Sequence, residues 1–265
     1  MRDVILGLAP VSEGDVDVGK DASVDFVKDI DGFIKNGISM IRLRVTDSEG
    51  KYSSDFDRFS QLAVWVRERA DIVIELPTEG GVDVTPNQRV DPLLLNPDVV
   101  SIMPGSVNCG SDVLYNPLGY VEFLIKYCSS SDLKPMFRVV SGGMIRRVAV
   151  LSHHIPEIYP PVVFNLVFGG DDFLPANYGS LLFLKEMLPP ESVWFASVKG
   201  ELSSAFVLMV VSLGGNLIIG REYNNSFDGK VVNSNMELVE RVVRLLNSAG
   251  YGIASVQRVR DLISM

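Results

Sequence analysis

Residues 193–220 read VWFASVKGELSSAFVLMVVSLGGNLIIG, and their hydrophobic pattern predicts a strand, a helix and a second strand. The outer runs, 193–198 and 216–220, are almost continuously apolar, which is typical of parallel strands that are buried on both faces. The segment between them, 203–213, has the length and the apolar spacing of a helix that packs on such a sheet. This unit predicts a parallel α/β architecture.

The same alternation extends along the rest of the chain. Strand-length apolar runs recur at 4–9, 38–44, 72–76, 99–103, 136–140 and 162–168, and helix-length segments lie at 22–35, 55–69, 118–127, 144–151, 178–187 and 236–249. Eight such strands in 265 residues fit a closed (β/α)8 TIM barrel better than an open sheet. We expect a single α/β domain, 1–265, with a short C-terminal helix over 255–264 that is capped by Ser255.

Composition limits the classes of partner. The net charge is −9 and the pI is about 4.8, so the surface repels phosphate backbones and nucleic acid is not expected as a partner. A local basic pocket inside this acidic surface is still compatible with a small anionic ligand. No run is long enough to cross a membrane, and Cys109 and Cys128 do not form a disulfide framework. These features predict a cytoplasmic protein with reduced thiols.

Polar residues gather where the predicted strands end. In TIM barrels this edge carries the chemistry, because the strands all point the same way and their carboxyl ends meet at one face. The candidates there are Arg42, Arg44, Glu75, Thr78, Ser106, Asn108, Arg138, Lys199, Glu222 and Asn224. Arg42 and Arg44 are two residues apart on one strand, so both side chains are expected to point into the barrel.

Three ordered motifs carry a resemblance to a known family. They are GGNLIIGREYN at 214–224, PGSVNCG at 104–110 and GISMIRLRVTDSEG at 37–50, with Thr78 and Gly80-Gly81 between the last two. Each motif is weak alone, but their order and spacing over nearly the whole chain resemble the β-keto acid cleavage enzymes. The family is typified by 3-keto-5-aminohexanoate cleavage enzyme.

The resemblance implies a metal-assisted cleavage related to a reversed Claisen condensation. A β-keto acid is held on zinc through its keto and carboxylate oxygens, and a fragment is exchanged with acetyl-CoA. Two histidines on the second strand and a glutamate after the eighth strand hold the zinc. The resemblance also implies a homo-oligomer.

The metal-binding positions differ in this chain. Arg42 and Arg44 stand at the two histidine positions, and only Glu222 keeps the family's ligand type. A guanidinium stays protonated and has no lone pair for a metal, and zinc sites in proteins usually need three or four ligands. The two histidines of the chain, His153 and His154, are adjacent and are not expected to chelate one ion. We therefore expect no zinc and no other cofactor, with acetyl-CoA retained as a candidate co-substrate.

Other positions of the family pattern differ as well. Tyr223 replaces an aspartate, Ile218 an arginine, Arg138 a glutamate and Pro77 a serine, while Glu13 falls near a family glutamate. The changes at positions 42, 44 and 138 add positive charge. Three cations that face one cavity repel one another unless carboxylates or an anionic ligand pair with them. The arginine fork suits a carboxylate well.

Two functional hypotheses follow. The first is a diverged, metal-independent carbon–carbon lyase or acyl transferase that acts on an anionic keto acid. Its candidate catalytic residues are Glu222 and Glu75, and its candidate substrate-binding residues are Arg42, Arg44, Arg138, Thr78, Ser106, Asn108 and Asn224. The second is an inactive barrel that binds an anionic metabolite or supports an oligomer. Open arginines at a cavity favour ligand binding, whereas arginines closed off by glutamates favour the inert scaffold.

Overall fold

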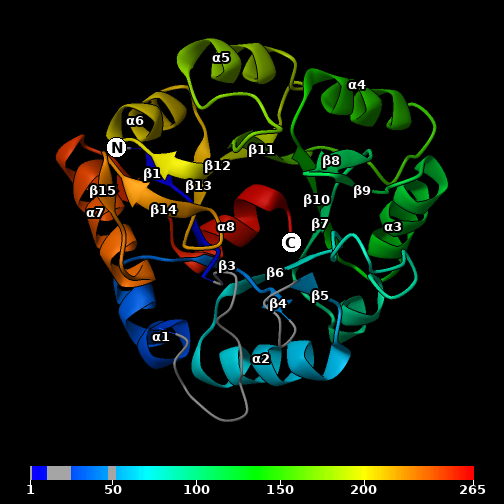
Figure 1. Cartoon of the computed structure of the whole chain (residues 1–265), viewed down its shortest axis with the longest axis horizontal. Coiled ribbons are helices and arrows are strands. Elements are labelled where there is room, and N and C mark those ends of the chain that lie inside the picture. Colours follow the sequence, from blue (N-terminus) through cyan, green and yellow to red (C-terminus); the bar gives the residue numbers. More distant parts are fainter. Residues whose placement is uncertain (1, 11–24, 47–51) are drawn as a thin grey trace.

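The fold is a closed barrel of eight parallel strands, within the residues that the computed structural model describes, 2–10, 25–46 and 52–265 (Figure 1). The barrel strands are β2 (Leu6–Leu8), β3 (Met40–Arg42), β6 (Val73–Pro77), β7 (Val99–Ile102), β10 (Lys134–Val139), β11 (Val163–Gly169), β12 (Val193–Leu202) and β13 (Asn216–Ile219). Neighbouring strands pair in chain order, and β13 pairs with β2 to close the ring. The TIM-barrel prediction is confirmed.

Helices surround the strands as an outer ring (Figure 1). They are α1 (Asp25–Lys35), α2 (Phe56–Arg69), α3 (Leu118–Ser130), α4 (Gly142–Leu151), α5 (Tyr178–Glu186), α6 (Ser204–Ser212) and α7 (Asn235–Ser248). Only a short 3-10 helix, η1 (Asp91–Leu95), lies between β6 and β7 in place of a full barrel helix. The first predicted helix, 22–35, begins outside the described residues.

Small sheets decorate the barrel. A parallel pair, β1 (Asp3–Val4) with β16 (Gly252–Ile253), ties the two chain ends together. At the carboxyl end of the barrel strands lie two hairpins, β4 (Val45–Thr46) with β5 (Tyr52–Ser53) and β8 (Val107–Cys109) with β9 (Asp112–Leu114). The strand β14 (Asn224–Phe227) pairs in parallel with the end of β12 and antiparallel with β15 (Lys230–Val231).

The predicted C-terminal helix is α8 (Val256–Ile263), and it closes one end of the barrel. Ser255 caps it by accepting a hydrogen bond from the Arg258 amide. Val259 and Ile263 pack with inward-facing strand residues such as Met40 and Val163 in one buried cluster. Figure 1, which looks along the barrel, shows α8 at the centre of the ring. The apolar plug at this end leaves the opposite, carboxyl end of the strands for a site.

The described residues include no helix of the length and apolar character that crossing a membrane requires.

Candidate functional site

Charged side chains replace apolar ones toward the carboxyl ends of the barrel strands. Met40 and Val73 point into the lower, apolar interior, and the residues two positions further, Arg42 and Glu75, pair in register above them. The same step of two leads from Met136 to Arg138. Alternate residues of a strand share a face, so the upper layer of the barrel interior becomes charged while the lower layer stays apolar.

Arg42 is the centre of a buried ion cluster. Its side chain is fully buried, and one terminal nitrogen donates a hydrogen bond to the Glu75 carboxylate. The other terminal nitrogen donates to Glu79 Oε2 at 2.8 Å, and Nε lies 3.4 Å from Glu222 Oε1. Three carboxylates around one guanidinium compensate its burial, which is otherwise very costly for a charge. Arg42 is therefore enclosed by glutamates.

Arg44 lies at the edge of the same cluster. Its Nε is 3.0 Å from Glu222 Oε1, and a terminal nitrogen donates to Glu79 Oε2 at 3.3 Å. The guanidinium also stacks on the ring of Tyr52, 3.9 Å from the ring centroid. Unlike Arg42, Arg44 lines a cavity.

Arg138 is buried but poorly paired. Only 7% of its side chain is exposed, yet its single ion pair in the described structure is a long one, 3.8 Å from NH1 to Glu79 Oε1. Its Nε has no hydrogen-bond partner among the described residues. The guanidinium faces the cavity and lies 5.5 Å from the centroid of the Tyr223 ring. A buried fork with unused donors is an anion-binding feature.

Burial and the neighbouring charges together shift the pKa values of Glu79 and Glu75 in opposite directions. Burial opposes the charge of Glu79, but Arg42, Arg138 and Arg44 outweigh it and lower the pKa of Glu79 to about 2. Burial raises the pKa of Glu75, and Arg42 only partly offsets that effect. Burial likewise raises the pKa of Tyr223 well above its ordinary value, so its phenol stays neutral. Glu79 is thus the firmly ionised partner of the arginines.

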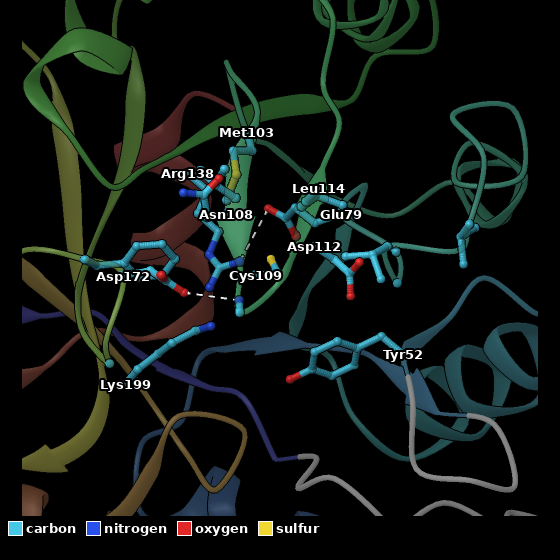
Figure 2. Close-up of a pocket in the computed structure, with 18 of the residues that line it drawn as sticks. Tyr52, Glu79, Met103, Asn108, Cys109, Asp112, Leu114, Arg138, Asp172 and Lys199 are labelled. Atoms are coloured by element: carbon cyan, nitrogen blue, oxygen red, sulfur yellow. Dashed lines mark hydrogen bonds and ion pairs between the residues drawn. The ribbon is translucent and has the colours of Figure 1, made fainter.

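The cavity opens above this cluster and has a volume of about 900 Å³. Arg44, Arg138 and Lys199 are its cations, and Glu79, Asp83, Asp112, Asp171 and Asp172 are its acids. Apolar walls come from Met103, Leu114 and Phe173 among others. Figure 2 shows Arg138, Glu79, Cys109 and Lys199 converging on this space, with Asp172 accepting from the Gly110 amide at 3.5 Å. Mixed polar and apolar walls of this size suit a small-molecule ligand.

The remaining candidates from the sequence have different surroundings. Asn108 is exposed and lines the cavity. Thr78 donates its hydroxyl hydrogen to the Ser101 carbonyl, and Ser106 accepts from the Asn116 amide. Asn224 donates to the Val198 carbonyl and accepts from the Gly220 amide. Thr78, Ser106 and Asn224 therefore have protein partners that fix the loops, and they do not line the cavity.

Glu75 and Glu222 lie behind the arginines and do not line the cavity either. One carboxylate oxygen of each, Oε2, has no hydrogen-bond partner among the described residues. Glu13 lies outside the described residues.

Sequence reasoning missed Glu79, which contacts all three arginines. It follows β6 in a loop, so strand periodicity did not select it. The available signal was charge balance, because three inward arginines need more compensating negative charge than Glu75 and Glu222 supply.

The donor atoms do not fit a zinc ion of the kind that the resemblance implies. Arg42 and Arg44 offer no lone pair, and Glu222 Oε1 lies against both guanidiniums. Over residues 2–10, 25–46 and 52–265, no three His, Cys, Asp or Glu side chains form a candidate metal site. A family-type zinc centre is therefore chemically mismatched to these side chains.

Comparisons with known proteins agree with the fold and identify the family. Residues 25–265 match the family described as beta-keto acid cleavage enzyme. The chain is 29% identical to a 3-keto-5-aminohexanoate cleavage enzyme of Fusobacterium nucleatum, over 91% of this chain and 89% of that protein. It is 27% identical to a 3-oxoadipate:acetyl-CoA acetyltransferase of Cupriavidus necator, over 86% of this chain and 82% of that protein.

A solved ternary complex of ObcA with a C4-CoA adduct and oxalate has the same fold. The TM-score is 0.74 at 14% sequence identity, with 91% of this chain and 66% of that chain covered. This chain therefore spans about two thirds of that structure's length. The match over most of the chain, together with the curated relatives, shows that this protein belongs to the β-keto acid cleavage enzyme family.

Proposed function

We propose that this protein binds a small anionic β-keto acid in the barrel cavity and cleaves a carbon–carbon bond in it without a zinc ion held by a histidine pair. In this respect it is a diverged member of its family. The observation that carries the proposal is Arg138, which is buried, faces the cavity and has unused hydrogen-bond donors. A carboxylate is the ligand that matches such a planar fork.

The other arginines have separate tasks in this proposal. Arg44 stands beside Arg138 at the cavity wall and adds a second positive charge for the ligand. Arg42, enclosed by carboxylates, holds Glu75, Glu79 and Glu222 in place and does not meet the substrate. Glu75 and Glu222 then act by positioning arginines, because neither reaches the cavity.

The experiment is a calorimetric titration of acetoacetate into the wild-type protein and two variants. Arg138→Met removes the fork but keeps a long side chain, and Arg146→Met changes an exposed arginine of α4 that lies outside the cavity. A hydrogen bond to a charged group contributes about 1.5–3 kcal/mol to the binding free energy. Arg138→Met should therefore bind acetoacetate about 10- to 100-fold more weakly. Arg146→Met should bind like the wild type. Equal binding by all three proteins would reject the proposed carboxylate site.

A second candidate function is acyl transfer to or from coenzyme A. The name of the Cupriavidus relative couples a keto acid to acetyl-CoA, and a cavity of about 900 Å³ is larger than a small keto acid needs. Incubation with a β-keto acid and acetyl-CoA, followed by mass spectrometry of the thioesters, tests it. New acyl-CoA products in wild type but not in Arg138→Met would favour transfer. Products without any CoA requirement would favour simple cleavage.

A cytoplasmic location and homo-oligomerisation stay predictions. The inactive-barrel hypothesis predicts ligand binding without any product in either assay.

A further inference from the structure

Lys199 is the one amine that lines the cavity among the described residues. It lies near the end of β12, in register with Gly169 of β11. Figure 2 shows its side chain extending into the cavity toward Cys109, on the side where Arg138 lies. An amine and a carboxylate-binding arginine therefore face the same space.

Among residues 2–10, 25–46 and 52–265, no carboxylate pairs with Lys199. Within the described part of the chain, its amine forms no ion pair or hydrogen bond, and its close neighbour is the Phe173 ring, 5.0 Å from the centroid. Lys199 is exposed at the cavity, but partial desolvation lowers its pKa, the charges of Arg138 and Arg44 lower it further, and Cys109 and Glu222 raise it. A lysine that is desolvated beside other cations is more often unprotonated, and therefore more nucleophilic, than one in water.

The backbone of Lys199 is held on both sides. The Gly170 amide donates to the Lys199 carbonyl at 3.2 Å, and the Gly200 amide donates to the Tyr223 carbonyl at 2.7 Å. Gly169 has a φ of +78°, and a Cβ atom there would lie 2.3 Å from the Lys199 carbonyl oxygen. This close approach fixes the backbone position of Lys199. The barrel sheet, and not a flexible loop, therefore sets the direction in which its side chain enters the cavity.

We propose that Lys199 is the nucleophile that activates the substrate, by forming an imine with the keto group of an acid whose carboxylate is bound by Arg138. The inference rests on the proposed function, since it needs the keto acid to occupy this cavity. The imine withdraws electrons from the bond to be broken, and the arginine–glutamate cluster has no group that does so.

The chemistry balances with water and one proton. The free amine of Lys199 attacks the keto carbon, the carbonyl oxygen takes up protons, and water leaves to give an iminium ion. The bond between the α-carbon and the carboxylate carbon then breaks, carbon dioxide leaves, and the electron pair moves into an enamine. A proton adds to the α-carbon, and water hydrolyses the imine to a ketone and the free amine. Lys199 is regenerated and no oxidant or reductant is needed.

The experiment traps the imine with cyanoborohydride in the presence of acetoacetate. Peptide mass spectrometry should place the adduct on Lys199, as reduced acetoacetate or, after decarboxylation, as an isopropyl group. Lys199→Met should lower total labelling at least about tenfold, because the reactive amine is gone. Lys126→Met is the matched control, since Lys126 is an exposed lysine of α3 outside the cavity. It should label like the wild type.

Lys199→Arg separates a covalent role from a purely electrostatic one. It places a permanent positive charge there without a nucleophilic amine, so acetoacetate should still bind in calorimetry while the adduct disappears. Binding that depends on Arg138 without any adduct on Lys199 would overturn the imine and leave the proposed function standing. Equal labelling of wild type and Lys199→Met at surface lysines would also overturn it. Absence of acetoacetate binding would overturn both proposals together.

Discussion

Arg42 and Arg138 carry the same side chain at similar depths in the barrel, but their partners give them different chemistry. Three glutamates surround Arg42, whereas Arg138 has one ion pair within the described structure, 3.8 Å long. The sequence predicted that both would point inward, because strand alternation decides that. It could not predict which arginine would be neutralised, because Glu79 reaches the cluster from a loop whose path no periodic pattern describes.

Glu79→Gln tests this balance of charges. The change leaves Arg42 and Arg44 short of a partner, and breaking a buried ion pair costs about 3–5 kcal/mol of unfolding free energy near neutral pH. The pKa of Glu79 is lowered from 4.5 to about 2, so its contribution is complete above pH 4.5 and is lost as the pH falls toward 2. In denaturant unfolding, the unfolding free energies of wild type and Glu79→Gln should therefore converge as the pH falls through this range.

Glu68→Gln is the control for the acid range. Glu68 lies on the surface and its ion pair is with the exposed Arg69, so its loss should change the unfolding free energy by less than about 1 kcal/mol at any pH. A gap between wild type and Glu79→Gln that stays constant from neutral to acidic pH would contradict the assigned role of Glu79.

At the scale of elements, hydrophobic runs predicted all eight barrel strands because each is buried on both faces. The predicted and observed ends of these strands differ by at most four residues; β12, for example, continues to Leu202, where it pairs with β14. The segment between β6 and β7 was harder to predict from the sequence, because η1 is too short to show a helical spacing of apolar residues. The C-terminal helix was predictable from its cap, Ser255, but its position inside the ring depends on tertiary packing.

Ile263→Ala tests the role of α8 as the plug of the barrel. Ile263 is 1% exposed and packs in the cluster of inward-facing strand residues. Truncation of such a side chain costs about 2–5 kcal/mol of unfolding free energy. Leu94→Ala, at a position that is 69% exposed, should cost less than about 0.5 kcal/mol. Similar unfolding midpoints for the two variants in urea would show that α8 does not seal the barrel interior.

At the scale of the whole molecule, the barrel separates two tasks. Apolar residues and α8 fill one end, and charges occupy the end where the strands point. The larger core cluster extends from Val4 to Leu246, and the single domain over 1–265 stays a prediction. The sequence could predict this division from the barrel alone, but the cavity depends on loops after the strands. Glu79 reaches it from the loop after β6 and Lys199 from within β12, and the convergence of the two side chains follows from no local pattern.

The central claim is that this family member binds its keto acid without zinc. The most direct test is calorimetric titration of acetoacetate into protein stripped with a chelator, with residual zinc measured by plasma mass spectrometry. The arginines hold the carboxylate in our account, so the dissociation constant should change by less than about twofold on stripping. Loss of binding on stripping, with recovery when stoichiometric zinc is returned, would contradict it.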